Sequence, residues 1–343
     1  MRKTFSGALL VVLTLVLIFT MSACGGAPAQ NNSQNNTQSD TKNSAQNNSQ
    51  TADSRNADDG ENYNTGDAGL DDPLNQDGIG EKELLVVSFG TSYNDSRRLC
   101  IGAIEKSLAE AFPDWSVRRA FTSDTIIKHI KKRDGIDIDS LDKALKRATD
   151  NGVKTLVIQP TLLMSGLEFD EMQKAAAPYA ASGSMKVSIG KPLLTGDEDF
   201  SKVADAMKES TSEYNKEGTA VCFMGHGTEA SSNEVYSHIQ QVFKDKGMSN
   251  YFVATVEAEP TLDDLVKMLK EGKYKKVVLQ PLMVVAGDHA NNDMAGDEED
   301  SWKSVLEKEG YEVVTVLKGM GELKTVRDIY TEHAKAAVNE SEK

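Results

Sequence analysis

The chain has 343 residues, of which 39% are hydrophobic, and a formal net charge of −15. An acidic surplus of this size repels nucleic acid and anionic lipid surfaces, which excludes a DNA-binding role and electrostatic docking onto a membrane. The length allows two folded domains, provided that most of the chain contributes to them.

The chain begins with a short secretory leader. Two basic residues precede an apolar run over residues 8–19, which is too short to span a bilayer. The small residues directly before Cys24 resemble the lipobox of bacterial lipoproteins, with Met21 where leucine is usual. We therefore expect residues 1–24 to be a signal peptide, Cys24 to carry the lipid, and the protein to be extracytoplasmic, in the periplasm or at the cell surface. An ordinary signal peptide cleaved near Ala23, or an uncleaved anchor, is the alternative.

The next segment, residues 25–80, is polar and low in complexity. Of its 56 positions, 17 are Asn or Gln. Its large apolar side chains are only Tyr63, Leu70, Leu74 and Ile79. So few apolar groups cannot offset the entropy lost on ordering the chain. The composition therefore predicts a disordered tether, followed by a folded part from residue 81.

From residue 83 onward, Val/Ile/Leu-rich runs alternate with amphipathic stretches, which is typical of βα units around a parallel sheet. The runs that predict strands are 84–88, 117–121, 155–159, 186–189, 220–224, 251–255, 276–280 and 312–316. Helical periodicity appears between them, for example over 95–111, 141–148, 200–214, 232–246 and 262–270. We expect an α/β protein of two similar doubly wound lobes, residues 81–195 and 196–343, each with a mainly parallel four-stranded sheet flanked by helices.

The two halves carry matching segments, which indicates an internal duplication. The sequence KTLVIQP at 154–160 matches KKVVLQP at 275–281, an offset of 121 residues. The same offset places Glu168 on His289.

A second match lies upstream. The sequence SFGT at 88–91 matches GHGT at 225–228, an offset of 137 residues that places Phe89 on His226. Repeated lobes favour a cleft between them, with a ligand bound where the carboxyl ends of the strands converge.

Two of the five histidines occupy positions suited to a ligand. His226 and His289 each fall past the end of a predicted strand, beside glycines that allow close approach of the backbone. Glu257 follows the predicted strand 251–255 and shares the same rim. Two imidazoles and a carboxylate suit a borderline divalent ion such as Co²⁺, Fe²⁺, Ni²⁺ or Zn²⁺. The alternative is that these histidines are hydrogen-bonded structural residues, and the spacing alone does not decide between the two.

The remaining histidines and cysteines have ordinary settings. We expect His129, His238 and His333 to be solvated residues on helices. Cys100 lies in a helical pattern and Cys222 in a strand pattern, without metal-type spacing, so both are expected to be small buried hydrophobes.

Five motifs together resemble a known enzyme family. In chain order they are SFGTS at 88–92, LLMSGLEFDEM at 162–172, GHGT at 225–228, VEAEP at 256–260 and VVAGDHANNDMAG at 284–296. They are similar to those of the anaerobic, CbiK-type sirohydrochlorin cobaltochelatase, a class II chelatase of cobalamin synthesis. The resemblance covers the chain from residue 83 to about residue 335.

The resemblance implies a two-lobed fold with a tetrapyrrole cleft and specific site residues. His226, Glu257 and His289 would hold the metal, and Glu168 would face the cleft from the first lobe. The chemistry of insertion makes His226 and Glu168 the expected catalytic groups: His226 could release the ion and accept protons, and Glu168 could accept a pyrrole proton or orient the ring. A helix N-terminal carboxylate with no ligand is the alternative for Glu168. The implied reaction inserts Co²⁺, or Fe²⁺, into sirohydrochlorin or a related tetrapyrrole, with no cofactor beyond that metal.

Export of the protein leaves a second function open. Most chelatases of this type are cytosolic, so an exported copy could instead be a surface lipoprotein that binds haem, a tetrapyrrole or a metal for uptake without catalysis. The expected partners are a tetrapyrrole, a divalent ion and a membrane reached through the lipid only, while homo-oligomer formation stays open. Basic residues available for substrate carboxylates are Arg97, Arg98, Arg118, Arg119 and Lys128.

Overall fold

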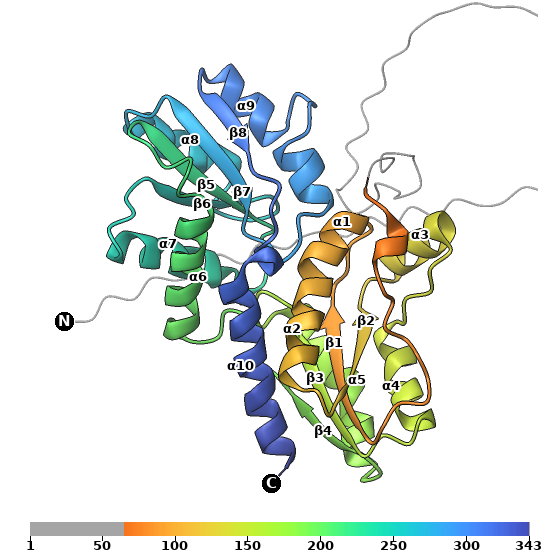
Figure 1. Ribbon diagram of the computed structural model, residues 1–343. Helices are drawn as coiled ribbons and strands as arrows, with labels where there is room; N and C mark the ends of the chain where they lie inside the picture. The colour runs from red at the N-terminus through yellow and green to blue at the C-terminus, as the bar shows by residue number, and fades with distance from the viewer. Residues whose placement is uncertain (1–64, 343) are drawn as a thin grey trace, which may run out of the picture. The chain divides into compact units, whose positions relative to one another are not determined.

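The computed structural model describes residues 65–342, and Figure 1 shows how their helices and strands are arranged. The leader with Cys24, and the tether up to residue 64, lie outside the described residues. Within residues 65–342, no helix has the length and apolar character that a membrane span requires.

Two four-stranded parallel sheets form the framework. The first contains β1 (Lys82–Ser88), β2 (Ser116–Phe121), β3 (Thr155–Pro160) and β4 (Lys186–Ile189), in the order β2-β1-β3-β4. The second contains β5 (Thr219–Gly225), β6 (Tyr251–Thr255), β7 (Lys276–Pro281) and β8 (Glu312–Thr315), in the order β6-β5-β7-β8. The expected α/β fold with two parallel sheets is confirmed, and all eight predicted strands are present.

The registers of the two sheets match residue by residue. Lys82 of β1 pairs with Thr155 of β3, and Thr219 of β5 pairs with Lys276 of β7. These pairs are related by the same two offsets, 137 and 121 residues, that relate the repeated motifs. The structural repeat therefore supports a duplication of one four-stranded lobe.

Helices cover both faces of each sheet (Figure 1). Those of the first lobe are α1 (Asn94–Ser96), the π-helical turn η3 (Arg97–Gly102), α2 (Ala103–Ala111), α3 (Asp124–Asp134), α4 (Leu141–Asp150) and α5 (Leu167–Ala181). Those that follow are α6 (Asp197–Ser210), η4 (Ser231–Asn233), α7 (Glu234–Asp245), α8 (Leu262–Glu271), the π-helical turn η5 (Ala290–Met294), α9 (Trp302–Lys308), η6 (Met320–Glu322) and α10 (Lys324–Ser341).

The strands are apolar on both faces because each face is covered. In β1, Leu84 and Val86 belong to a core shared with α2, α6, α7 and α10. Leu85 and Val87 point the other way, into a cluster with α4 and α5. The continuous apolar runs of the sequence are thus those of parallel strands buried on two sides.

The last helix does not lie only in the lobe to which the sequence assigned it. The expectation assigned everything from residue 196 to the second lobe, but α10 returns to the first sheet. The hydroxyl of Ser188 in β4 donates to the carbonyl of Ala337 (2.8 Å), and the hydroxyl of Tyr330 donates to the carbonyl of Leu162 (3.1 Å). The apolar side of α10, including Ile329 and Tyr330, completes the shared core. Burial of that side explains where the helix lies.

Residues 65–80 also differ from expectation. The tether was expected to reach residue 80, yet residues 65–80 lie on the first lobe, with a short 3₁₀ turn, η2 (Ala68–Leu70). The prediction of disorder is wrong for this segment because polar contacts hold it. Asp71 is paired with two buried arginines, and the side chain of Asn75 donates to the carbonyl of Asp137 (2.7 Å).

Candidate metal centre

The candidate ligands lie past the carboxyl ends of three adjacent strands of the second sheet. His226 comes directly after β5, and Glu257 comes two residues after the end of β6. His289 is farther from its strand than the sequence indicated, because seven residues separate it from the end of β7, and it directly precedes η5. Parallel strands end on one rim, which brings the three residues together.

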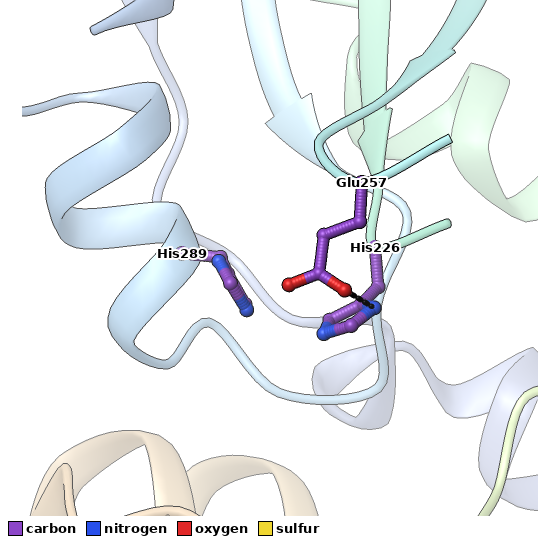
Figure 2. Close-up of side chains that lie close together, drawn as sticks. All are labelled: His226, Glu257 and His289. Atoms are coloured by element: carbon purple, nitrogen blue, oxygen red, sulfur yellow. Dashed lines mark ion pairs between the residues drawn. The ribbon is translucent and has the colours of Figure 1, made fainter. Parts of the chain in front are cut away.

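The three side chains converge closely enough to hold one ion (Figure 2). Each offers a nitrogen or oxygen atom, and these atoms all lie within 4.8 Å of one another. The rings of His226 and His289 meet edge to face, with centroids 4.7 Å apart. The Glu257 carboxylate lies 3.7 Å from Nδ1 of His226. The side chains are 47%, 43% and 31% exposed for His226, Glu257 and His289, so an ion and a second ligand can reach them from solvent.

Hydrogen bonds orient both imidazoles. Nδ1 of His226 lies 2.8 Å from the carbonyl oxygen of Gly227, and Nδ1 of His289 lies 2.6 Å from the carboxylate of Asp293. Both partners are acceptors, so each Nδ1 donates and each Nε2 keeps its lone pair. The hydrogen bond that His289 donates to the Asp293 carboxylate raises the pKa of His289. A carboxylate behind a histidine ligand is the usual way to fix ring orientation and increase basicity.

Two glycines make room for the loop that carries His226. A Cβ on Gly225 would collide with the Tyr236 ring, and Gly227 has φ +91°, a conformation that favours glycine. The amide of Gly227 donates to the hydroxyl of Tyr236 (3.3 Å). The two glycines of the GHG sequence therefore allow the backbone conformation of the loop that carries His226.

Glu168 belongs to the other lobe and is not part of the three-residue cluster. It is exposed in the first turn of α5, whose N-cap is Gly166. A Cβ on Gly166 would lie 3.8 Å from Oε2 of Glu168 and 3.3 Å from Oγ of Ser232, so the start of α5 lies close to η4 of the second lobe. The arrangement fits a proton acceptor and equally fits a carboxylate at a helix N-terminus.

A cavity of about 680 Å³ lies between elements of the two halves. The loop before α5 contributes Met164 and Ser165, and the start of α7 contributes Val235 and His238. None of the three candidate ligands lines it. The cavity is therefore separate from the three-residue cluster.

The other cysteines and histidines considered from the sequence only partly match expectation. Cys100 and Cys222 are fully buried free thiols, as expected. Among the histidines, His238 is partly exposed and stacks on Phe200. His333 is not solvated: its side chain is only 12% exposed and lies 3.4 Å from the carboxylate of Asp199.

Three of the arginines considered for substrate binding are unavailable. Arg97, Arg118 and Arg119 are buried and paired with carboxylates. They occupy the interior because acidic partners lie there, which the sequence did not reveal. Arg98 and Lys128 remain at the surface.

Sequence reasoning missed Asp293. It lies four residues after His289, a spacing that places two side chains on the same side of a helical turn, and this was the available signal. Its role depends on the turn η5, which the loop-like sequence around it does not predict.

Comparison with known proteins identifies a family and two sequence relatives. The cobalt chelatase (CbiK) family matches residues 82–339. The sirohydrochlorin cobaltochelatase of Salmonella typhimurium is 34% identical over 259 residues, which cover 76% of this chain and 97% of that protein. The sirohydrochlorin cobaltochelatase CbiKC of Nitratidesulfovibrio vulgaris is 31% identical over 260 residues, 76% of this chain and 91% of that protein.

The fold has solved counterparts. SirB from Bacillus subtilis with Fe³⁺ superposes with a TM-score of 0.54 at 14% identity, covering 77% of this chain and 98% of that one. The sirohydrochlorin chelatase SirB from the subspecies spizizenii, in complex with cobalt, gives 0.52 at 13% identity, covering 77% and 97%. At this identity the likeness concerns the fold alone. The family match and the two sequence relatives cover three quarters of the chain, which belongs to the cobalt chelatase (CbiK) family.

Proposed function

We propose that this protein inserts Co²⁺ into sirohydrochlorin, or into a closely related tetrapyrrole, at the rim of the second sheet. The observation that carries the proposal is the cluster of His226, Glu257 and His289 in a chain of the cobalt chelatase family. Both sequence relatives described above are named sirohydrochlorin cobaltochelatases, which supports the same substrate here.

In the proposed reaction the three side chains hold the incoming ion. Two neutral nitrogens and one carboxylate leave a net positive charge on the ion, so it stays attractive to the nitrogens of the tetrapyrrole. The exposure of these side chains leaves coordination positions open for water and then for the ring. Fe²⁺ would bind the same donors more weakly than Co²⁺, following the general order of affinity for divalent metals.

Insertion also requires that protons leave. Two pyrrole N–H groups lose their protons as the metal binds the four ring nitrogens, so the reaction converts the free ring and Co²⁺ into the metallated ring and two protons. Glu168 is proposed to accept one of them, because it begins the helix that meets the second lobe: a Cβ on Gly166 would lie 3.8 Å from Oε2 of Glu168 and 3.3 Å from Oγ of Ser232. His226 is proposed to accept the second when it releases the ion, since imidazole can exchange protons near neutral pH.

We also propose that the protein works outside the cytoplasm on a lipid carried by Cys24. The support is the sequence: a charged start, an apolar run, a cysteine after small residues and a polar tether. The acidic folded part would not bind an anionic membrane by charge, so the lipid would be the contact.

The same leader favours a second candidate, a surface lipoprotein that captures haem, a tetrapyrrole or a metal for uptake. A haem binder needs an axial ligand, whereas this chain brings together three metal-binding side chains. The cluster therefore favours the chelatase.

A metallation assay separates the two functions. The full chain is mixed with sirohydrochlorin and Co²⁺, Fe²⁺ or Ni²⁺, and the absorbance of the metallated ring is followed. The wild type should exceed the uncatalysed rate, most strongly with Co²⁺, and His226→Ala and His289→Ala should lose this rate. The variant His129→Ala, which removes an imidazole from α3, is the matched control and should keep it. Binding of the ring without metallation by the wild type would favour the uptake protein.

A further inference from the structure

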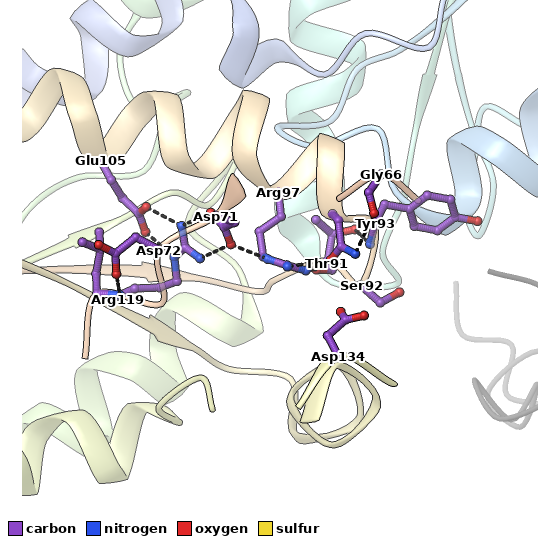
Figure 3. Close-up of polar contacts among 12 residues, drawn as sticks. Gly66, Asp71, Asp72, Thr91, Ser92, Tyr93, Arg97, Glu105, Arg119 and Asp134 are labelled. Carbon is purple, nitrogen blue, oxygen red and sulfur yellow. Dashed lines mark hydrogen bonds and ion pairs between the residues drawn. The ribbon is translucent and has the colours of Figure 1, made fainter. Parts of the chain in front are cut away.

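The segment Thr65–Leu74, here called the strap, precedes the region matched by the family and lies across the first lobe (Figure 3). Its apolar contribution is small, since Leu70 is 63% exposed and Leu74 packs only partly against the core. The carbonyl of Leu74 accepts a hydrogen bond from the amide of Arg119, in the edge strand β2 (3.2 Å). Hydrophobic burial does not explain why the strap lies where it does.

Buried charges hold the strap. The side chain of Asp71 is 3% exposed and lies between two fully buried guanidinium groups. It accepts hydrogen bonds of 2.6 Å from Nε of Arg97 and 2.6 Å from Nη1 of Arg119. Arg119 is paired as well with Glu105 of α2, at 2.6 Å. Two arginines thus balance two carboxylates, and one of these carboxylates comes from the strap.

The strap reaches the rim of the first sheet through Arg97. That guanidinium donates to the carbonyl of Thr91 (3.3 Å) and to the side-chain oxygen of Asn94 (2.6 Å). Both acceptors belong to residues 91–95, here called the rim loop, which follows the carboxyl end of β1. Asp71 therefore fixes the arginine that supports this loop from inside.

The strap also touches the rim loop directly. The amide of Asp95 donates to the carbonyl of Thr65 (2.7 Å), and the side chain of Asn94 donates to the carbonyl of Gly66 (3.1 Å). Gly66 has φ +96°, and a Cβ there would overlap the carboxylate of Asp95. The contact is close enough that only glycine fits.

The rim loop in turn meets the lobe that carries the metal centre. Oγ1 of Thr91 lies 3.1 Å from the position that a Cβ on Gly287 would occupy. Gly287 is two residues before His289. A continuous set of contacts therefore runs from Asp71 through Arg97 and Thr91 to the edge of the candidate site.

We propose that the strap fixes the rim loop against the loop of His289, and that Asp71 is a positioning residue for the tetrapyrrole. This inference rests on the proposed function. The metal ligands themselves lie in the second lobe and have their own orienting hydrogen bonds, so they do not depend on the strap. Loosening the strap affects how the ring is held between the lobes and leaves ion binding unchanged.

Two variants of the full chain test the inference, each with a matched control. Asp71→Asn removes the buried charge, and Asp72→Asn makes the same change at the exposed neighbouring residue. Gly66→Ala disturbs the contact with Asp95 without touching a buried charge, so it serves if Asp71→Asn folds poorly. Gly69→Ala is its control within the strap.

The readouts separate positioning from stability. Asp71→Asn and Gly66→Ala should raise the KM for sirohydrochlorin on the order of tenfold, with a smaller change in kcat, because the ring is held less well. Co²⁺ titration without tetrapyrrole should give the wild-type affinity. Amide hydrogen exchange over residues 91–97 should be faster than in either control.

The opposite results would overturn the inference. If the KM of both variants equals that of the controls while only the melting temperature falls, the strap is a stabilising segment and nothing more. If the wild type inserts no metal, the proposed function fails; the dissociation constant for sirohydrochlorin and the exchange data then decide about the strap, and unchanged values in both would reject it.

Discussion

The amide of Glu257 donates a hydrogen bond of 2.9 Å to the carbonyl oxygen of His226. These residues follow neighbouring strands, whose last register pair is Gly225 with Thr255. Main-chain bonding thus fixes two candidate ligands relative to each other before any ion arrives. His289 comes from a longer loop and takes its orientation from Asp293 instead.

This difference predicts that Asp293 matters for metal affinity. Asp293→Ala should weaken Co²⁺ binding roughly 10- to 100-fold, because His289 loses the acceptor that orients its ring and increases its basicity. Titration of the protein with Co²⁺, followed by the visible absorption of the bound ion, gives the affinity. Asp288→Ala removes a neighbouring carboxylate that bonds to Asn292 instead. Equal losses in the two variants would show that charge, and not ring orientation, is responsible.

Glu168 should act in the chemical step and not in ion binding. Glu168→Gln keeps the size of the side chain and removes the proton acceptor, so the rate of insertion should fall by roughly 10² to 10⁴ while Co²⁺ affinity is unchanged. Stopped-flow absorbance with saturating metal measures the rate. Asp170→Asn is the control, since Asp170 is an exposed acid in the same first turn of α5. A similar loss in both variants would assign Glu168 to helix stabilisation.

The framework was predictable because its signals are local. The run 84–88 is apolar at four of its five positions, and β1 is indeed buried on both faces, with Leu84 in one core cluster and Leu85 in another. Once the strands are placed, parallel strands carry the residues that follow them to one rim. His226 and Glu257 follow from that argument almost directly.

The strap and Asp293 could not be predicted because their signals are not local. The composition around Asp71 is that of a disordered chain, and its buried position depends on Arg97 and Arg119, which lie 26 and 48 residues away. The average composition of a segment does not indicate whether one of its residues forms an ion pair with a residue far away in the sequence. The position of Asp293 beside His289 likewise depends on the π-helical turn η5, which no periodic pattern in the sequence predicts.

The strap leads to a prediction about stability. A chain that starts at residue 81 should unfold at lower urea concentration than one that starts at residue 65. Removing Asp71 leaves Arg97 buried without its paired carboxylate, and breaking a buried pair in this way costs about 3–5 kcal/mol. Urea denaturation followed by circular dichroism measures the difference. Equal midpoints would mean that water or a shift of Arg97 replaces the lost contact.

The leader predicts a change of location. Replacing Cys24 by Ser should move the protein from the membrane fraction to the soluble fraction, because the acidic folded part has no electrostatic attraction to lipid. Cell fractionation with immunoblotting checks this, and Cys100→Ser, at a buried thiol, is the control for loss of a cysteine. A Cys24→Ser variant that stays in the membrane fraction with unchanged mobility would point to an uncleaved anchor.

A buried acid far from the metal centre predicts how stability depends on pH. Glu83, near the start of β1, is fully buried, and neither carboxylate oxygen has a hydrogen-bond partner among the described residues. Burial raises the pKa of its carboxyl from 4.5 to about 7. Arg118, at 3.9 Å, offsets only part of this effect.

The folded protein therefore holds the Glu83 proton more tightly than the unfolded chain does. Between pH 4.5 and about 7 the unfolded chain releases the proton first, so the free energy of unfolding should fall as the pH rises, by up to about 3 kcal/mol. Glu83→Gln keeps the shape and removes this titration. Urea denaturation gives the free energy of unfolding of both proteins at each pH. The value for the variant minus that for the wild type should increase up to about pH 7 and stay constant above it. A difference that is the same at every pH would mean that Glu83 stays ionised in the folded protein, held by Arg118.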